Sequence, residues 1–265
     1  MIPYRHNMHI HTFRSSCAHD EMVVAAIVER AVGAGIETIG LVDHVNLGSQ
    51  REIAFLAEDR RDVERLSTPL KVLVGAEVTM LSPRRPAMTP QQVQGLDFVM
   101  VSSNHYHLSD IVEQPPSRSP ESIAEHGLAM LEGAIETGMT DIIAHPLVLT
   151  KVGWFAPDEI MRHFTPERLA PVLRKAADRR VAMELNPRLV ERFPDFYTMF
   201  IPACKEHGVR FALGSDAHSL ESIAYAEDGV YRGAGPRELA ALGVRDEDLI
   251  DLRQLQRRAP KQGQS

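Results

Sequence analysis

The segment Met8-His9-Ile10-His11-Thr12, close to the beginning of the 265-residue chain, decides how the rest of the sequence is understood. Residues two apart on a β-strand point to the same face, so a strand over 5–12 would aim His9 and His11 at one point. Met8 and Ile10 would then face the opposite way and pack. Two neutral imidazoles that converge on one point are the beginning of a metal site. An H-x-H pair is a weak signal alone, and it gains weight because later segments also deliver His, Asp or Glu just after an apolar run.

Short apolar runs alternate with amphipathic stretches along the chain, which is typical of βα units around a parallel sheet. No linker-like stretch divides the chain, so we predict a single domain over 1–258, followed by a polar, disordered tail over 259–265. The predicted strands, seven in all, cover 5–12, 37–43, 71–77, 96–103, 141–144, 181–186 and 210–214. The predicted helices cover 20–35, 49–66, 120–137, 166–179 and 197–207, with shorter helical pieces around 221–228, 236–242 and 247–256.

The composition is that of an ordinary globular protein, with 44% hydrophobic and 25% charged residues. The net charge of −7 argues against a nucleic-acid polymer as a partner, because such partners need a basic stripe. No run approaches the roughly 18 apolar residues of a membrane span and no apolar signal region is present, so we expect a cytoplasmic protein without a membrane partner. The two cysteines, Cys17 and Cys204, show no disulfide framework and are expected to be reduced thiols. The sequence is compatible with a homo-oligomer and does not specify the oligomeric state.

Most of the predicted strands run directly into metal-ligating residue types. In parallel βα folds the functional residues gather at the carboxyl ends of the strands, and a barrel closes those ends into one ring. We therefore expect these side chains to converge on one site. The alternative, that they are all buried structural polar residues, requires many independent strand ends to agree. The residues are His9, His11 and, shortly after, His19; Asp43 and His44; Glu77; His105; His145; and Asp216 and His218.

The order of these blocks resembles that of the PHP (polymerase and histidinol phosphatase) family, in particular its histidinol-phosphatase-like phosphoesterases. The resemblance implies an α/β fold, a distorted seven-stranded (β/α)7 barrel with a metal site at the carboxyl ends of the strands. The first and last blocks are its most specific parts. The blocks that carry it are His9-Ile10-His11-Thr12, Val42-Asp43-His44, Gly75-Ala76-Glu77, Ser103-Asn104-His105, His145-Pro146 and Gly214-Ser215-Asp216-Ala217-His218.

The resemblance also implies a centre of two to three divalent transition metals, with one carboxylate bridging two of them. Cys17-Ala18-His19 resembles the C-G-H segment of histidinol phosphatases, but two extra residues precede it. We expect His19 to be the loop ligand, with Cys17 as the alternative, and Asp43 to support a ligating histidine. The implied ligands are His9, His11, Glu77 and Asp216 for the first metal, Glu77, His105 and His145 for the second, and His44, His218 and His19 for the third.

Such a centre suits hydrolysis of a phosphate ester. Imidazole and carboxylate ligands favour Zn, Mn or Fe over Ca or Mg. A hydroxide that bridges two metals would attack phosphorus, and the third metal would neutralise charge on the phosphate. Glu77, Asp216 and His218 are the expected catalytic residues, and the leaving alcohol would take its proton from metal-bound water or from Asp216.

The substrate is expected to be a small phosphorylated metabolite. A phosphodiesterase on small cyclic or nucleotide substrates, an amidohydrolase-like C–N or lactone hydrolase, and a non-catalytic module are the alternatives; the complete ligand set disfavours the last. Arg14 and Arg188 are predicted to bind the phosphate, although both could also be plain surface charges. Other candidates for substrate contacts are Asn104, Tyr106, Trp154, Arg84, Arg85 and Lys151.

Overall fold

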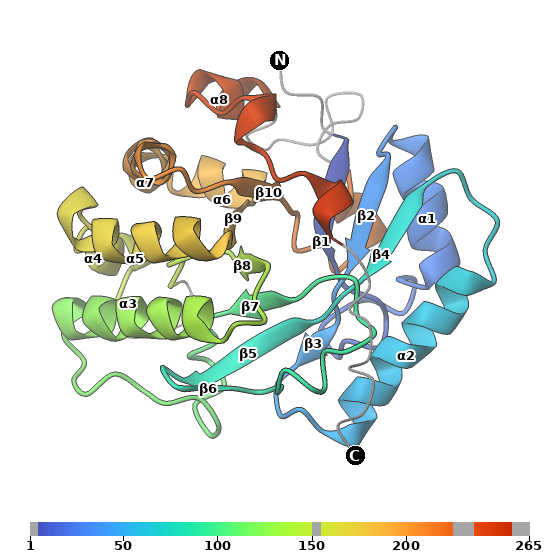
Figure 1. Ribbon diagram of the computed structural model, residues 1–265, viewed down its shortest axis with the longest axis horizontal. Coiled ribbons are helices and arrows are strands. Elements are labelled where there is room, and N and C mark those ends of the chain that lie inside the picture. The colour runs from blue at the N-terminus through green and yellow to red at the C-terminus, as the bar shows by residue number, and fades with distance from the viewer. Residues whose placement is uncertain (1–4, 150–154, 225–235, 256–265) are drawn as a thin grey trace.

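The computed structural model describes residues 5–149, 155–224 and 236–255, and its strands form the wall of a barrel (Figure 1). The strands are β1 (His6–Ile10), β2 (Thr38–Leu41), β3 (His44–Val45), β4 (Lys71–Val74), β5 (Glu77–Ser82), β6 (Arg85–Pro86), β7 (Met100–Ser102), β8 (Ile142–Ala144), β9 (Ala182–Leu185) and β10 (Phe211–Leu213). The helices are α1 (Val24–Gly33), α2 (Gln50–Glu64), α3 (Pro120–Glu136), α4 (Pro157–Met161), α5 (Pro166–Arg179), α6 (Pro187–Arg192), α7 (Pro194–Glu206) and α8 (Pro236–Ala241). Short 3-10 turns cover Leu220–Ser222, Asp246–Asp248 and Leu252–Gln254.

The barrel wall has seven strand tracks, because two tracks each consist of two successive strands, β2 with β3 and β4 with β5, and both tracks extend beyond the predicted strands 37–43 and 71–77. β1, β2 and β4 pair in one sheet, and β3, β5, β7, β8, β9 and β10 pair in the other, all in parallel. Only two residues separate β2 from β3 and β4 from β5. Backbone hydrogen bonds from Gly75 N to Leu41 O (2.8 Å) and from Glu77 N to Asp43 O (3.0 Å) continue the pairing across these breaks.

The first and last tracks, β1 and β10, close the barrel mainly through loops and side chains. Ile10 forms a parallel bridge with Ala217, and His11 N donates to Ala217 O at 3.0 Å. Below this bridge the Asn7 side chain donates to Ser215 Oγ at 2.7 Å. The prediction of a distorted seven-stranded (β/α) barrel is therefore confirmed.

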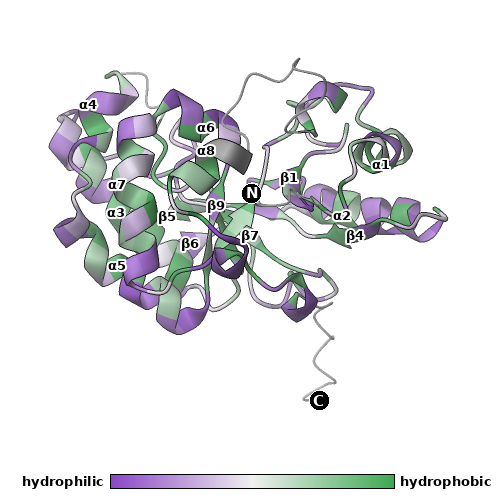
Figure 2. Ribbon diagram, turned by 90° about the horizontal axis from the view of Figure 1, so that it is seen from above, coloured by the Kyte–Doolittle hydropathy of each residue, from purple (hydrophilic) through white to green (hydrophobic). Residues whose placement is uncertain are grey.

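Apolar side chains fill the interior of the barrel, and polar residues lie at the carboxyl ends of its strands. One buried cluster takes a residue from almost every track, among them Met8, Met100, Ile142, Ala182 and Ala212, so it lies inside the wall. Around the wall, α3, α4, α5 and α7 stand on one side and α1 and α2 on the other (Figure 1). Helices such as α2 and α5 alternate between polar and apolar residues in Figure 2, as expected when one helix face is buried. Among the described residues, no helix is long and apolar enough to cross a membrane.

Several element boundaries differ from those predicted. α1 begins at Val24 rather than at residue 20, because residues 15–22 form turns in which Ala18 N and Met22 N donate to Ser15 O and His19 O. The short helices α4 and α6 were not predicted, since five or six residues show no helical period. The segment 247–256 contains 3-10 turns instead of a helix. The predicted tail 259–265 and the candidates Lys151 and Trp154 lie outside the described residues.

Candidate metal centre

Glu77 lies at the middle of the centre, and its carboxylate faces imidazoles on both sides. Its side chain is fully buried at the start of β5. Oε1 lies 3.1 Å from His145 Nε2 and 3.3 Å from His105 Nε2. Oε2 lies 2.7 Å from His44 Nδ1 and 3.5 Å from His11 Nε2. A carboxylate with nitrogen donors on each oxygen has the arrangement of a bridging ligand between two cations.

A second group forms where β1 meets the loop after β10. His9 Nε2 and His11 Nε2 are 3.1 Å apart, although His11 lies just beyond the end of β1. Asp216 Oδ1 lies 3.3 Å from His9 Nε2 and 3.1 Å from His11 Nε2. The backbone at Asp216 has a φ of 52°, and His145, on the opposite side of Glu77, has a φ of 30°. Both ligand-type residues thus adopt a left-handed conformation that non-glycine residues rarely occupy.

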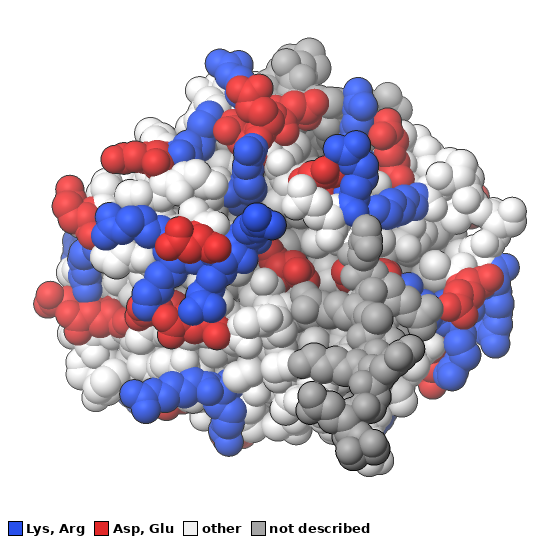
Figure 3. Space-filling model, viewed as in Figure 1, with Lys and Arg blue, Asp and Glu red and all other residues white. Residues whose placement is uncertain are grey.

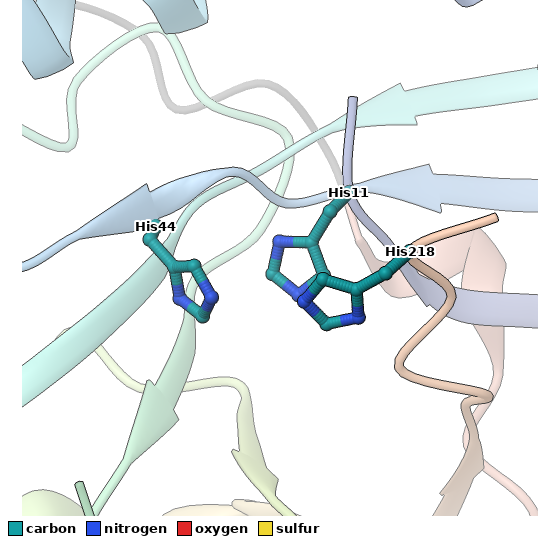
Figure 4. A group of neighbouring side chains, drawn as sticks. All are labelled: His11, His44 and His218. Atoms are coloured by element: carbon teal, nitrogen blue, oxygen red, sulfur yellow. The ribbon is translucent and has the colours of Figure 1, made fainter. Parts of the chain in front are cut away.

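A third group lies nearest the surface and contains His11, His44 and His218. Figure 4 shows the three rings turned toward a common space, with His11 and His218 stacked at a centroid distance of 4.4 Å. The centroids of His11 and His44 are 4.3 Å apart. Cys17 joins this group, because its Sγ lies 3.1 Å from His218 Nε2. Eight of the side chains that the strand ends were expected to bring together are therefore neighbours, and nitrogen or oxygen atoms within each of four trios lie within 4.8 Å of one another.

Glu184 fixes two of the ligand-type histidines and was not predicted. From the middle of β9 its Oε1 accepts a hydrogen bond from His9 Nδ1 at 2.9 Å, and its Oε2 accepts one from His145 N at 2.5 Å. A side chain at Gly214 would place a Cβ 2.1 Å from Glu184 Oε1, so glycine is required there. The signal was a carboxylate inside the otherwise apolar run Val181-Ala182-Met183-Glu184-Leu185, which should carry a charge only with a partner.

Hydroxyl groups fix the orientation of two further rings. Thr79 Oγ1 donates to Asn46 Oδ1 at 2.7 Å, so it accepts from His105 Nδ1 at 2.8 Å. By the same logic Ser15 Oγ donates to Asp43 Oδ1 at 2.8 Å and accepts from His11 Nδ1 at 3.3 Å. Asp43 therefore supports a ligand-type histidine through Ser15.

These contacts fix the tautomers so that lone pairs point inward. His9, His11 and His105 each use Nδ1–H outward, which leaves an Nε2 lone pair aimed at Glu77 or Asp216. Neutral rings held this way place acceptor against acceptor, and a divalent cation between them makes the contacts attractive.

Burial and close opposite charges also shift the pKa values of several groups at this centre. Burial alone would raise the pKa of Glu77, but His44 and its neighbours hold it well below its usual range. Burial alone would lower the pKa of His44, yet Glu77 and Cys17 raise it to about 10. Burial would likewise raise the pKa of Cys17, and hydrogen bonds with His218 and His44 bring it down to about 6. Metal cations compete with protons for such groups at neutral pH.

The residues present fit a metal centre by a second test, the hydrogen bonds of its buried atoms. Glu77 Oε2 and His44 Nδ1 are buried and, among the described residues, have no hydrogen-bond partner of suitable geometry, although they are only 2.7 Å apart. A buried carboxylate oxygen left in this state is costly. A cation would satisfy both atoms, and the imidazole–carboxylate donor set suits Zn, Mn or Fe.

A cavity of ≈ 210 Å³ opens above the third group. Asp216, at its edge, exposes 34% of its side chain. The described lining includes no lysine or arginine but five histidines, so a bound anion would meet imidazoles and any metal that they hold. The residues that line the cavity are Ser16, Cys17, His44, Asn46, Asn104, His105, His107, Leu108, His145, Val148, Leu189, Asp216 and His218.

The structure does not bring His19 to the centre. Its side chain is 67% exposed, and its Nδ1 lies 3.9 Å from Glu21 Oε1. The turn from Ser15 to Ala18 rotates the loop so that Cys17 faces His218 instead. The alternative ligand, Cys17, is thus the one that the structure places at the site, and the expectation for His19 is corrected.

Arg14 is turned away from the cavity, contrary to its predicted contact with substrate. Its guanidinium donates to Asp59 Oδ1 at 2.8 Å, to Asp62 Oδ2 at 2.6 Å and to Glu58 Oε2 at 3.1 Å. All three carboxylates belong to α2. Arg14 therefore ties the loop after β1 to this helix.

The other candidate substrate contacts have mixed outcomes. The Asn104 amide lines the cavity, but it donates to His145 O at 3.0 Å and to Val148 O at 2.8 Å, which gives it a structural role. Tyr106 is buried, and its hydroxyl bonds His126 Nδ1 at 2.8 Å. Arg188 is exposed at the start of α6, beside the lining residue Leu189, and its substrate contact stays a prediction.

Comparisons with known proteins agree with this geometry. A probable phosphatase of Clostridium novyi (strain NT) is 23% identical over 223 residues, which cover 82% of this chain and 80% of that protein. A probable phosphatase of Aliivibrio fischeri (strain ATCC 700601 / ES114) is 26% identical over 225 residues, with 83% and 80% covered. The solved histidinol phosphate phosphatase of Lactococcus lactis subsp. lactis, complexed with zinc, L-histidinol and phosphate, has a TM-score of 0.60 at 16% identity and covers 90% of this chain and 92% of its own.

The family match is the most direct of these findings. The profile described as PHP domain matches residues 7–188, which include most of the ligand-type residues described above. Asp216 and His218 lie beyond the match but complete the same cluster. The chain therefore belongs to the PHP domain family and is a metal-dependent hydrolase.

Proposed function

We propose that this protein is a phosphomonoesterase that uses two to three divalent metals, Zn, Mn or Fe, to hydrolyse a small phosphorylated metabolite. The observation that carries the proposal is the position of the Glu77 carboxylate among the imidazoles of His44, His105 and His145, which line a small cavity. When bound, the metals would activate water as the nucleophile and neutralise charge on the phosphate.

The chain's own residues then divide the work. His9, His11 and Asp216 would hold one metal and share Glu77 with a second, which His105 and His145 complete. His44 and His218 would hold a third. Glu184 keeps His9 in the tautomer that ligation needs.

Asp216 and His218 lie where a bound phosphate ester would meet the metals. Burial alone would raise the pKa of Asp216, but His9 and His11 hold it well below its usual range. Asp216 therefore stays ionised and serves as ligand and acceptor, which makes it a poor proton donor for the leaving alcohol.

The size and charge of the molecule support a small substrate. The cavity of ≈ 210 Å³ has room for little more than a compact ester. On the face seen in Figure 3, acidic and basic side chains are interspersed without a continuous basic stripe of the kind that nucleic-acid polymers need. The Lactococcus lactis histidinol phosphate phosphatase, whose structure is complexed with zinc, L-histidinol and phosphate, supports a phosphomonoester of this size class. Unpaired Cys17 and Cys204 support a reducing, cytoplasmic location.

The test is a substrate screen on protein loaded with Mn²⁺ or Zn²⁺, with metal content measured in parallel. Monoesters, cyclic phosphates, linear diesters, amides and lactones are offered separately. We expect phosphate release from monoesters, with loss of activity on chelation and in Glu77→Gln. Turnover of cyclic phosphates or diesters alone would favour a phosphodiesterase, and turnover of amides or lactones alone a C–N or lactone hydrolase. Either result would overturn the proposal.

A further inference from the structure

The loop after β1 presents a sulfur atom to the metal centre, and this sulfur has two imidazole neighbours. Cys17 Sγ lies 3.1 Å from His218 Nε2, and Cys17 also interacts with His44. Cys17 lies in the wall of the cavity, so it is accessible to a cation that enters there. Zn–S and Zn–N bonds of about 2.3 and 2.0–2.1 Å allow one ion to contact two atoms at this separation.

The ring of His218 is oriented for ligation. Its Nδ1 lies 2.8 Å from the backbone oxygen of Asp216, which can only accept, so Nδ1 carries the proton. Nε2 is left with its lone pair, and it faces Cys17. The tautomer that ligates a metal is therefore already selected by the backbone.

The position of Cys17 is determined by the turns of its loop, by the hydrogen bond from His19 N to His218 O and by the ion pairs of Arg14. Ser15 N donates to Thr12 O at 3.0 Å, and Ala18 N donates to Ser15 O at 2.9 Å, which forms consecutive turns. His19 N then donates to His218 O at 2.9 Å and joins the two segments. Together with the ion pairs of Arg14, these bonds direct the sulfur inward and leave the His19 ring in solvent.

We propose that Cys17, His44 and His218 form a sulfur-containing metal subsite that selects a thiophilic cation such as Zn²⁺ over Mn²⁺, and that this subsite distinguishes one metal of the centre from the others. The proposal rests on the proposed metal-dependent function and specifies one of its sites. The other ligand groups contain only nitrogen and oxygen donors, which also accept Mn²⁺ and Fe²⁺. A thiolate donor shifts preference toward softer ions.

The test uses Co²⁺, which reports sulfur ligation directly. A thiolate bound to Co²⁺ gives a charge-transfer band in the near ultraviolet, whereas imidazole and carboxylate ligands do not. We load the full chain with Co²⁺ and compare wild type, Cys17→Ser and His19→Ala. Cys204→Ala is the matched control, because it removes the buried cysteine. Circular dichroism checks that each variant is folded.

We expect the band in wild type, His19→Ala and Cys204→Ala, and its loss in Cys17→Ser together with about one equivalent of bound zinc. A wild type that binds cobalt without the band, or a band that survives in Cys17→Ser, would overturn the proposal. Cys17→His should restore the lost equivalent without the band and accept Mn²⁺ there. Phosphatase activity without a sulfur band would refute only this inference, while a sulfur band without any phosphatase activity would refute only the proposed function.

Discussion

The metal centre has an inner and an outer part that are held in different ways. The inner group consists of Glu77, His9 and Glu184, whose side chains are all fully buried on strands. The outer group consists of Cys17, His44 and His218. His44 and His218 expose 20% and 29% of their side chains, and Cys17 is exposed on a loop.

The contacts behind each group explain the difference. Inner residues have a second polar partner within the barrel, as His9 has in Glu184, so their geometry is set when the barrel folds. Cys17 depends on a loop that Arg14 ties to α2. We therefore expect a metal held by the inner group to exchange more slowly with solvent than a metal held by the outer group.

The largest effect should follow from breaking the inner group at its centre. Glu77→Gln removes the negative charge that two metals would share in the proposed function, and it should lower kcat/KM by about 10³-fold or more. Metal analysis should show the loss of two equivalents. Normal metal content with normal activity would contradict the bridging role.

A smaller effect should follow from removing the support of an inner ligand. Glu184→Gln keeps the shape but weakens the orientation of His9, and outer partners of this kind are worth about 10- to 100-fold in metal affinity or activity. Metal titration and kinetics measure both. The matched control is Glu191→Gln, the same substitution at an exposed position of α6, which is expected to change neither quantity. If the two substitutions had equal effects, Glu184 would have no special role in orienting His9.

Arg14→Ala tests the anchor of the outer group. It removes hydrogen bonds to three side chains of α2, so we expect the free energy of unfolding to fall by about 2 kcal/mol. The outer metal should also bind more weakly. Arg65→Ala, which removes an exposed ion pair with Asp62 on the same helix, is the control and should cost at most about 1 kcal/mol. Chemical denaturation measures the free energy of unfolding of both variants. If Arg14→Ala raised KM and left the free energy of unfolding unchanged, Arg14 would be a substrate-binding residue after all.

A pH-dependent effect is expected at the carboxyl pair of Asp59 and Asp43, beneath this anchor. Burial, together with the charge of Asp43, raises the pKa of Asp59 well above its usual range. The folded protein therefore keeps a proton that the unfolded chain releases near pH 4, and the free energy of unfolding should fall as pH rises from there to the raised pKa. Asp59→Asn should flatten this slope. Melting temperatures measured across the range would show it, and parallel curves would contradict the shift.

The order of apolar runs and ligand-type residues along the sequence was sufficient to predict the fold and most of the ligand-type residues. Glu77, His105 and His145 each follow an apolar run, and parallel strands bring such positions to one end of a barrel whatever the intervening helices do. The continuation of two strand tracks through β3 and β5 was not predicted, because Asp43-His44 and Glu77 interrupt the apolar runs at which the strands were expected to end.

Residues whose role depends on tertiary neighbours were predicted less well. Cys17 and His19 differ by two positions, and only the turn at Ser15 decides which of them faces His218. Arg14 pairs with carboxylates 44 to 48 residues away, which no local pattern reveals. Glu184 acts on β1 and β8 from β9, so its partners become known only once the strand order is known.

The left-handed backbone at His145 and Asp216 has a consequence for engineering and for evolution. Each such residue is worth about 1–2 kcal/mol of strain, which a glycine would relieve. Selection for heat resistance alone would therefore favour glycine at 216 and would discard a ligand in the process. A variant selected for thermal stability without an activity screen is therefore expected to carry substitutions at positions 145 and 216, where they would abolish metal binding.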